Sequence, residues 1–416
     1  MKVLIVTPCG RLPVPATKGG AIQDLVESLV RQNQIENKLK LSIVSPFEEE
    51  AARKAQVYSS TEFIYLHKSR FIEKTDDVIN KCIAIAKGKR ATEKKRYYLW
   101  MLYVIMKLVK LLSSERYDAV VFENRGYFLN IFRSGRLLRK YDGRIFLRLH
   151  NKTYYYGYKK ALKKTSILLI SEYMKRVLCE DLGKEFEKNS YIFRNGFNAD
   201  KFKTVLSSAE YKEIRESFGI GEFDKVIIFV GRITAIKGVY ELTEAFNKID
   251  KERIKLLVLG SSLFGLDVTS SFEKKMKEIF EKERDRIIFT GYVPNSEIWK
   301  YYKIADIAVL PTVGEEAAGL AMLEAQSAGL PLITTRSGGI PEYVDHESSI
   351  LLENDGELVN NLVSAIYEVI DNYSFWKKRA ESSRDFITEN YSESKYYNEF
   401  IEILSNCIHV KENETR

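Results

Sequence analysis

The sequence predicts an α/β protein with two domains, each built on a parallel sheet. Short apolar, β-branched runs alternate with segments of helical length along the chain, which is typical of buried parallel strands joined by helices. The pattern also begins twice, at KVLIVTP (Lys2 to Pro8) and at KVIIFVGR (Lys225 to Arg232), and each run is followed by a loop with glycine and a helical pattern. At 416 residues with 45% hydrophobic residues, the chain is long enough for two cored domains.

Further apolar runs mark the other strands that we expect. They begin at Lys40, Tyr117, Arg144 and Ile167 in the first half and at Ile254, Arg286, Ala305 and Leu330 in the second. Glycine, Asn and Asp interrupt the pattern between Asn195 and Phe202, which is typical of a linker. We therefore expect an N-terminal domain over residues 1–197, a C-terminal domain over 198–390 and a final segment, 391–416, that forms an amphipathic helix.

The charge of the chain is divided unequally between its halves. Residues 1–200 hold 38 Lys and Arg against 21 Asp and Glu, a net charge of +17, while the remainder holds 27 against 36, a net charge of −9. A basic half is typical of a protein that meets an anionic partner, such as membrane lipid, polyprenyl phosphate or nucleic acid. Ordinary solvated surface charge is the alternative, and the sequence leaves both open.

The composition disfavours several classes of protein. The four cysteines, Cys9, Cys82, Cys179 and Cys407, form no C-x-x-C pair, so neither a disulfide framework nor a thiolate metal site is expected. The opening MKVLIVTP lacks a small-residue cleavage site, so no signal peptide is expected. The longest apolar run, Tyr97 to Met106, has roughly half the length that spans a bilayer. We expect a cytoplasmic protein that is soluble or peripheral on the inner face of the membrane.

The loop after the first expected strand is a candidate ligand site, because ligands of open parallel sheets bind beyond the carboxyl ends of strands. It starts at Pro8, reads PCGRLPVPATKGGAIQ, and reaches Gly19 and Gly20 at a helix start. Two glycines there allow an anion or a sugar to approach free backbone N–H groups. The loop is not G-x-G-x-x-G, which disfavours a nicotinamide dinucleotide. Turn formation alone is the alternative.

The loop after the strand at Lys225 reads GRITAIKG, from Gly231 to Gly238. Between its glycines lie Arg232 and Lys237, a guanidinium fork and an ammonium that can converge on a diphosphate. Such cations stabilise a departing nucleoside diphosphate without a metal. The sequence has no D-x-D motif for a metal-clamped nucleotide, so no metal is expected. Two exposed loop cations are the alternative.

The segment GEEAAGLAMLEAQSAGLP, from Gly314 to Pro331, carries two acids in a helix-forming stretch of otherwise buried composition. The helix is expected to begin between residues 317 and 319 and to end at Ala328, so Glu316 precedes it and Glu324 lies inside it. If the whole interval were helical, the two acids would lie roughly 12 Å apart. That is about the span from a sugar across a diphosphate to a ribose.

The start of this helix is a candidate phosphate site. The N–H groups of Ala318, Gly319 and Leu320 would face the phosphates, because the first N–H groups of a helix lack helical partners. Glu316 would then bind sugar hydroxyls and Glu324 ribose hydroxyls. An ordinary charge at a helix N-terminus and a buried acid paired with a cation are the alternatives.

Taken together, these motifs resemble the retaining glycosyltransferases of family 4. The matching stretches are FVGRITAIKG, LGSSLFG, TGYVPNSEI, ADIAVLPT and EEAAGLAMLEAQSAGLPLITTRSGGIPEYV, and RLPVPATKGGAIQ is similar to the branch with spore-coat and capsule polysaccharide enzymes. The resemblance covers about residues 225–345, and in the first half only the first 30 residues, the strand ending in RLHN and the stretch from Tyr191 to Phe202. It implies the GT-B fold, in which two Rossmann-like domains face each other across a cleft, with the C-terminal helix crossing back to the N-terminal domain.

The resemblance also implies a role for each matching residue. The cations bind the donor diphosphate, the first glutamate binds the transferred sugar, and the second glutamate binds the ribose. Two loops hold the base, and the N-terminal glycines contact the donor. A histidine at the end of a strand lies near the anomeric centre. The implied catalytic residues are His150, Glu316, Arg232 and Lys237, and the implied donor-binding residues are Gly19, Gly20, Gly231, Arg232, Lys237, Ser261, Gly291, Tyr292, Val293, Glu316, Ala318, Gly319, Leu320 and Glu324.

Two positions complicate this transfer of roles. His150 ends the run RIFLRLH, where a histidine with a purely structural role is the alternative. The family often has Pro-Phe-Gly after the first glutamate, whereas this chain has Ala317 and Ala318 before Gly319. The loss of the ring reshapes the space beside the sugar, so the identity of the sugar stays open.

The implied function is transfer of a sugar, with retention of configuration, from a UDP- or GDP-linked donor to a glycan or polyprenyl-linked glycan in surface polysaccharide synthesis, without metal or cofactor. Same-face attack is expected, because no second carboxylate is evident for double displacement. The acceptor is expected on the basic N-terminal domain, where Lys87 to Arg116 either lies on an anionic membrane or forms a buried helix with a charged tip. The alternatives are a soluble GT-B enzyme that makes a disaccharide or other small glycoside, a phosphorylase, and a non-catalytic protein that binds nucleic acid, for which no motif is present.

Overall fold

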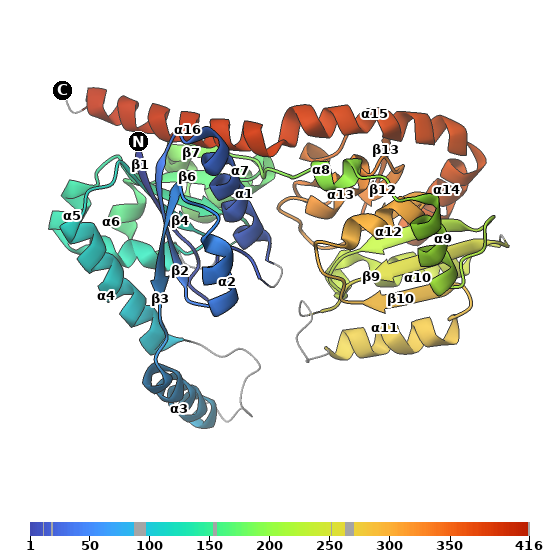
Figure 1. The fold of residues 1–416 in the computed structure, drawn as a ribbon, viewed down its shortest axis with the longest axis horizontal. Helices are drawn as coiled ribbons and strands as arrows, with labels where there is room; N and C mark the ends of the chain where they lie inside the picture. The colour runs from blue at the N-terminus through green and yellow to red at the C-terminus, as the bar shows by residue number, and fades with distance from the viewer. Residues whose placement is uncertain are drawn as a thin grey trace. The chain divides into compact units, whose positions relative to one another are not determined.

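The computed structural model describes residues 1–10, 12–17, 20–86, 97–152, 156–250, 252–262 and 270–414. The chain divides into two compact units, neither of which is continuous in sequence. The first unit consists of Met1–Leu169, Leu178–Phe193 and Tyr397–Arg416, and the second of Ile170–Val177 and Arg194–Tyr396. Each unit contains one parallel sheet flanked by helices (Figure 1).

The first unit is built on a seven-stranded parallel sheet in the order β3-β2-β1-β4-β5-β6-β7. Its strands are β1 (Lys2–Val6), β2 (Lys40–Pro46), β3 (Thr61–Leu66), β4 (Ala119–Glu123), β5 (Ile145–Leu149), β6 (Ser166–Leu169) and β7 (Ser190–Ile192). β4, β5 and β6 are buried along their whole length, as their continuous apolar sequences require. The predicted strands are all present, while β3 and β7 had no predicted counterpart.

Helices and short 3₁₀ segments connect these strands. They are α1 (Ala21–Glu36), α2 (Glu49–Ala55), α3 (Arg70–Ala86), α4 (Tyr98–Ser114), η1 (Gly126–Arg133), α5 (Gly135–Lys140), α6 (Lys159–Leu162), α7 (Glu172–Leu182) and η2 (Lys184–Asn189). α4 buries one residue in every four, namely Trp100, Val104, Leu108 and Leu112. Residues 87–96 of the cationic segment considered above lie outside the described residues.

The second unit is built on a six-stranded parallel sheet in the order β10-β9-β8-β11-β12-β13. Its strands are β8 (Lys225–Val230), β9 (Ile254–Leu259), β10 (Ile287–Gly291), β11 (Ile307–Leu310), β12 (Leu332–Thr335) and β13 (Ser349–Leu352). All but β13 begin within two residues of a predicted run. The prediction of two Rossmann-like α/β domains is confirmed.

The second sheet is covered by helices that supply the rest of its core. They are α8 (Asp200–Lys203), α9 (Ser208–Ser217), η3 (Ala235–Lys237), α10 (Val239–Asn247), α11 (Ser271–Lys282), α12 (Ile298–Ile304), α13 (Leu320–Ser327), η4 (Ile340–Glu342), α14 (Leu358–Asp371) and α15 (Tyr373–Tyr391). α10 packs against α14, and α13 packs against α15. The side chains of Phe246, Tyr302 and Ile366 are fully buried between these layers.

The last helix, α16 (Glu393–Glu414), belongs to the first unit from Tyr397 onward. The Tyr397 hydroxyl donates a hydrogen bond of 2.6 Å to Oδ1 of Asn33 on α1. The ring of Phe400 stacks on Phe193, with 5.6 Å between centroids. The core of the first unit therefore includes residues from the far end of the sequence. Among the helices that the structure describes, none is both long enough and apolar enough to cross a bilayer.

Candidate functional site

The candidate site lies where the second sheet reverses its winding direction. β9 lies on one side of β8 and β11 on the other, so the connections that leave β8 and β11 diverge. In doubly wound sheets the crevice beyond the carboxyl ends of such strands binds ligands. The loop after β8 carries Arg232 and Lys237, and the loop after β11 carries Glu316. The fold thus brings together two loops that separate sequence patterns identified.

Gly238 allows these two loops to approach each other. Its φ is 72°, a left-handed conformation, and a Cβ atom at this position would collide with the carbonyl oxygen of Pro311. The N–H groups of Val313 and Gly314 both donate to the carbonyl of Ile236, at 3.0 and 2.9 Å. The backbone therefore holds the two loops together independently of their charged side chains.

Lys237 and Glu316 form an ion pair between the Nζ and Oε2 atoms. Their side chains are 21% and 23% exposed, so the pair is only partly shielded from solvent. The backbone beside Glu316 is fixed, because the N–H of Gly339 donates to the carbonyl of Glu316 at 2.7 Å and Oγ of Ser171 donates to that of Ala317 at 2.8 Å. The carboxylate of Glu316 therefore extends from a well-supported loop.

Helix α13 begins at Leu320, next to this loop, with Gly319 as its N-cap residue. No side chain caps it, and among the described residues the N–H groups of Ala318, Gly319 and Leu320 have no hydrogen-bond acceptor. Unpaired N–H groups at a helix start attract anions. Because the helix starts at Leu320, the loop containing Glu316 is not helical, and the helical rise does not give the separation of Glu316 and Glu324.

Glu324 lies one turn into α13 and is held by Tyr302 of α12. The Tyr302 hydroxyl lies 3.2 Å from Oε2 of Glu324 and 3.3 Å from the carbonyl oxygen of Ala321. Burial, and then the Glu324 carboxylate, raise the pKa of Tyr302 well above its ordinary value, so the hydroxyl remains a donor. The orientation of Glu324 is thereby set by a fully buried ring.

A pocket of about 490 Å³, including the space open to solvent, lies at the ends of β8, β9 and β10. Its lining consists of Val230, Gly231, Arg232, Leu259, Gly260, Ser261, Tyr292, Val293 and Ile298. Gly260 has φ of 142°, and a Cβ atom there would collide with the carbonyl oxygen of Gly231. Glycine at this position brings two strand ends close together and shapes the floor of the pocket.

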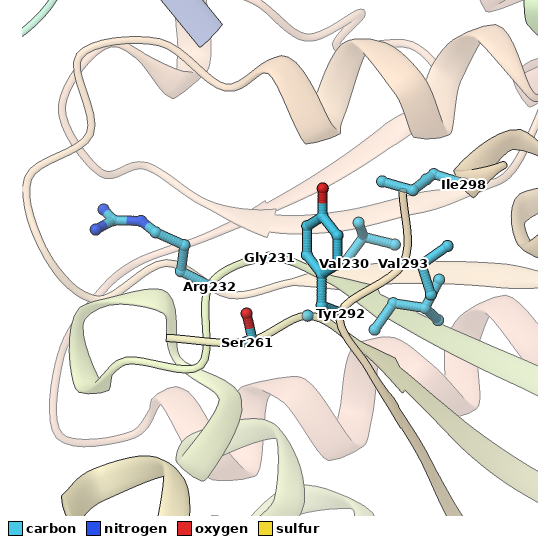
Figure 2. Close-up of a pocket in the computed structure, with 9 residues that line it drawn as sticks. Val230, Gly231, Arg232, Ser261, Tyr292, Val293 and Ile298 are labelled. Carbon is cyan, nitrogen blue, oxygen red and sulfur yellow. The ribbon is translucent and has the colours of Figure 1, made fainter. Parts of the chain in front are cut away.

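The pocket has an apolar end and a cationic end. Figure 2 shows Val230, Val293 and Ile298 grouped around the ring of Tyr292, while the guanidinium of Arg232 extends away from them. The Tyr292 side chain is 39% exposed, and Arg232 is exposed with no ion pair within the described part of the chain. A planar apolar group with an attached anion matches this arrangement, because the ring accepts stacking and the guanidinium binds the charge.

In the first unit, His150 follows β5 and contacts Glu123, the last residue of β4. The Nε2 atom of His150 lies 2.6 Å from Oε2 of Glu123. The side chain of Glu123 is fully buried, as is that of Arg148, whose Nη1 lies 3.9 Å from Oε1 of Glu123. Burial and then Arg148 lower the pKa of His150, against the raising effect of Glu123, so the imidazole is neutral at pH 7.

The structure describes one of the two predicted glycines of the first unit. Gly20 is the N-cap residue of α1, whereas Gly19 lies outside the described residues. No sequence prediction of site residues covered four supporting residues, Ser171, Tyr302, Glu123 and Gly338, or four lining residues of the pocket, Val230, Leu259, Gly260 and Ile298. A Cβ atom at Gly338, where φ is 60°, would collide with the carbonyl oxygen of Glu316. Among the four supporting residues, only Gly338 lies in a recognisable local pattern, the SGG of its loop. The other three contact residues that are far away in the sequence.

Comparison with protein families matches part of the second unit. Residues 210–391 match the family described as "Glycosyl transferases group 1". The match includes the loop with Arg232 and Lys237, the lining of the pocket, and both Glu316 and Glu324. The residues that form the candidate site therefore lie within the segment that matches this family.

Related proteins align over different shares of the chain. An uncharacterized glycosyltransferase of Methanocaldococcus jannaschii is 29% identical over 46% of this chain and 47% of its own length. The putative glycosyltransferase YtcC of Bacillus subtilis is 24% identical over 91% of this chain and 85% of its own length. Spore coat protein SA of the same species is 23% identical over 78% of each chain. The chain thus spans about half of the first of these relatives and most of the other two.

Solved structures share the fold at low sequence identity. HepE of Anabaena in complex with UDP has a TM-score of 0.71 at 15% identity, covering 98% of this chain and 100% of that one. The same protein has also been solved in complex with UDP-glucose, with a TM-score of 0.70. These matches show that the chain has the GT-B fold, with one Rossmann-like sheet in each unit.

Proposed function

We propose that this protein is a glycosyltransferase that moves a sugar from a nucleoside diphosphate sugar to a glycan acceptor. The observation that carries the proposal is the ion pair of Lys237 and Glu316 next to the start of α13, on the two loops that leave the switch point of the second sheet. Arg232, on the first of these loops, lines a pocket with an apolar end. An anion site next to a site for a planar ring suits a nucleoside diphosphate. The match of residues 210–391 to a glycosyl transferase family supports this reading.

Each part of the donor has a proposed partner. The base occupies the pocket beside Tyr292 and Val293, close to the backbone of Ser261, and the ribose hydroxyls bind Glu324. Arg232, Lys237 and the N–H groups at the start of α13 bind the diphosphate. The ion pair of Lys237 and Glu316 adjoins this diphosphate site, so the Glu316 carboxylate binds hydroxyls of the transferred sugar.

We propose that transfer proceeds on one face of the sugar, with retention of configuration. The bond between the anomeric carbon and the diphosphate oxygen breaks with its electron pair moving to the diphosphate, and the acceptor oxygen forms the new bond. The acceptor proton passes to the departing phosphate oxygen. The protein stabilises the negative charge with Arg232, Lys237 and oriented N–H groups, so the proposal includes no metal or cofactor. His150 is the proposed partner of a substrate hydroxyl in the first unit.

UDP is the first nucleotide to test, because a structural neighbour has been solved with UDP and UDP-glucose. Calorimetry with UDP and GDP should give saturable binding, and incubation with the matching sugar nucleotides and a glycan acceptor should release the diphosphate. Arg232→Ala should weaken nucleoside diphosphate binding about 10- to 100-fold, as expected for loss of a charge-assisted contact, and abolish turnover. Arg284→Ala is the matched control, because Arg284 is exposed and pairs only with the neighbouring Glu281 among the described residues. Unchanged affinity in Arg232→Ala contradicts the assignment of the diphosphate site.

The proposed acceptor is a lipid-linked glycan of a surface polysaccharide, met by the first unit on an anionic bilayer. α3 and α4 pack together and leave apolar side chains exposed. On α3 and α4 these are Phe71, Val78, Ile85, Leu102 and Met106, and Lys74, Lys81, Lys107 and Lys110 are exposed on the same helices. We call this set the α3–α4 surface. Apolar groups among lysines suit the interface of a membrane with anionic lipids.

Vesicle flotation tests this part of the proposal. The protein should float with vesicles that contain phosphatidylglycerol and remain behind with purely zwitterionic ones. Replacing both Leu102 and Met106 by Ser should abolish flotation, while Ile35→Ser, which removes an even more exposed apolar residue of α1, should not. Equal flotation of the double variant contradicts membrane binding through this surface. A soluble enzyme that makes small glycosides would then be the better reading of the same donor site.

A further inference from the structure

Glu123 is a buried carboxylate to which the proposed function gives no role. It ends β4, and the register of β4 and β5 places it directly opposite Arg148. β1 and β4 are also the strands between which the first sheet reverses its winding direction, so Glu123 and His150 lie at the edge of the sheet where ligands of such folds bind. A fully buried carboxylate costs stability unless it is paired, which calls for an account of its partners.

The hydrogen bond between Glu123 and His150 takes its polarity from the carboxylate of Glu123, which also faces the guanidinium of Arg148. A carboxylate accepts hydrogen bonds and does not donate them, so the proton in the 2.6 Å contact lies on Nε2 of His150. The backbone N–H of His150 is also held, by Oδ1 of Asn124 at 3.2 Å. Both the ring and the backbone of the histidine are therefore fixed by residues at the end of β4.

Arg148 supplies the positive charge that balances the buried carboxylate of Glu123. Its guanidinium carbon lies 4.4 Å from the centre of the Phe193 ring, and its Nη1 faces the Glu123 oxygen that is not bonded to His150. One buried cation and one buried anion balance each other, so a second positive charge on His150 would be uncompensated. The imidazole consequently stays neutral, with one nitrogen protonated and the other a free acceptor.

We propose that Glu123 is a positioning residue that holds His150 in the tautomer with hydrogen on Nε2, so that Nδ1 accepts a hydrogen bond from a hydroxyl of the glycan acceptor. Nδ1 has no hydrogen-bond partner among the described residues. The assignment of this hydroxyl rests on the proposed glycosyltransferase function. The tautomer itself does not, because it follows from the contacts of Glu123 alone.

Replacing Glu123 by Gln should reverse the tautomer. The amide has one oxygen and one NH₂ group, and Arg148 attracts the oxygen to the side that now faces Nη1. The NH₂ group is then left to donate to Nε2 of His150, which moves the imidazole hydrogen to Nδ1. Glu123→Asp keeps an acceptor on a shorter side chain, so it should preserve the tautomer of the native protein.

The direct test is nitrogen NMR of protein labelled with ¹⁵N-histidine. The chain has only four histidines, so His150→Asn assigns the resonances of His150. The native protein at pH 7.5 should show Nε2 protonated and Nδ1 unprotonated, and Glu123→Gln should show the reverse. A charged imidazole or the opposite tautomer in the native protein overturns the inference. This measurement needs no variant of Glu123, so it remains decisive if Glu123→Gln does not fold.

Kinetics supply the second readout. Glu123→Gln should lower kcat about 10- to 100-fold, a typical loss for a group that orients a functional histidine, with UDP affinity unchanged because the proposed nucleotide site lies in the second unit. Glu123→Asp should recover most of this loss, and Glu115→Gln, which alters an exposed carboxylate of the same unit, should have no effect. Native kcat in Glu123→Gln with a reversed tautomer would disprove the role of Nδ1. If no sugar nucleotide is turned over at all, the proposed function fails while the NMR result still decides the tautomer.

Discussion

Lys237 and Glu316 are bound to each other, although we assign them to different parts of one donor. A donor that binds to both must exchange this ion pair for a contact between Lys237 and phosphate and a contact between Glu316 and sugar hydroxyls. The exchange limits the net gain from each new contact, because an existing interaction is lost. Free nucleoside diphosphate makes only the first contact and leaves Glu316 without its cation.

This arrangement predicts different effects for the two glutamates. Glu316→Ala should lower kcat/KM for sugar transfer about 100-fold, the loss of a charge-assisted hydrogen bond made to the sugar. Its affinity for free UDP should be equal to that of the native protein or higher, because Lys237 loses its competing carboxylate. Glu324→Ala should instead weaken UDP binding about 10-fold through the ribose, as expected for one hydrogen bond to a charged group. Calorimetry for UDP and a diphosphate-release assay for transfer measure the two effects, and similar losses in both assays for Glu316→Ala would refute the division of roles.

At the level of secondary-structure elements, the candidate site depends on a glycine at the start of α10, where the loop after β8 ends. Gly238 has positive φ and also lies against Pro311, so a side chain there meets two separate penalties. Gly219 has a similar φ, 63°, but a Cβ atom added there would meet no atom of the described residues within 4 Å. Comparing alanine substitutions at Gly219 and Gly238 therefore separates the cost of backbone strain from the cost of a steric collision, within one unit of the protein.

Gly219→Ala should cost roughly 1 kcal/mol of unfolding free energy, the strain of a left-handed alanine. Gly238→Ala should cost more, about 2–4 kcal/mol, because the loop must also move away from β11. Urea unfolding measures both. Gly238→Ala should in addition weaken UDP binding, since movement of the loop displaces Arg232 and Lys237. Equal stability of the two variants would show that the contact with Pro311 adapts at little cost.

The strands absent from the prediction share one property: β3, β7 and β13 are all edge strands. A central strand is covered on both faces and paired on both sides, so its sequence is a continuous apolar run that is easily recognised. β7 has three residues, and most of β13 is only half-buried, so the apolar pattern is short or diluted. β10 is the one edge strand that the sequence predicted, because its first three residues, Ile287 to Phe289, form a continuous apolar run.

The candidate site was predictable where a single loop or helix start carries its chemistry. Arg232, Lys237, Glu316 and Glu324 lie in local patterns of cations, glycines and acids. Tyr302 has no such pattern, because its hydroxyl acts on a residue of another helix and its own sequence context is that of a core aromatic. The contact of Glu123 with His150 likewise depends on pairing between β4 and β5, which local patterns do not specify.

At the level of the whole molecule, the buried group around His150 links stability to pH. Burial and Arg148 lower the pKa of His150 in the folded protein below its ordinary value of 6.5. As the pH falls through 6.5, the unfolded chain takes up a proton at this histidine and the folded protein does not. The unfolded state then binds more protons, so the free energy of unfolding decreases with falling pH. Above pH 6.5 the histidine is neutral in both states and contributes no pH dependence.

His150→Asn should therefore flatten the pH dependence of stability below pH 6.5. Urea midpoints measured between about pH 5.0 and 7.5 should fall more steeply with acidification for the native protein than for the variant. The comparison concerns the slopes only, because the substitution also removes the partner of Glu123 and so shifts the whole curve. Parallel curves would mean that the folded protein protonates His150 as readily as the unfolded chain does.

The chain enters the second unit twice, and this limits how that unit can be transplanted into another protein. The second unit includes Ile170–Val177, where Ser171 binds the carbonyl of Ala317 and the N–H groups of Glu172 and Tyr173 donate to the Glu342 carboxylate at 2.7 and 2.9 Å. A chimera that transplants only residues 194–396 would leave this segment behind. The support of the loop that carries Glu316 would then depend on whatever sequence the recipient supplies. A graft intended to transfer donor specificity therefore has to begin before Ile170. This starting point lies inside the N-terminal domain, residues 1–197, that the sequence predicts.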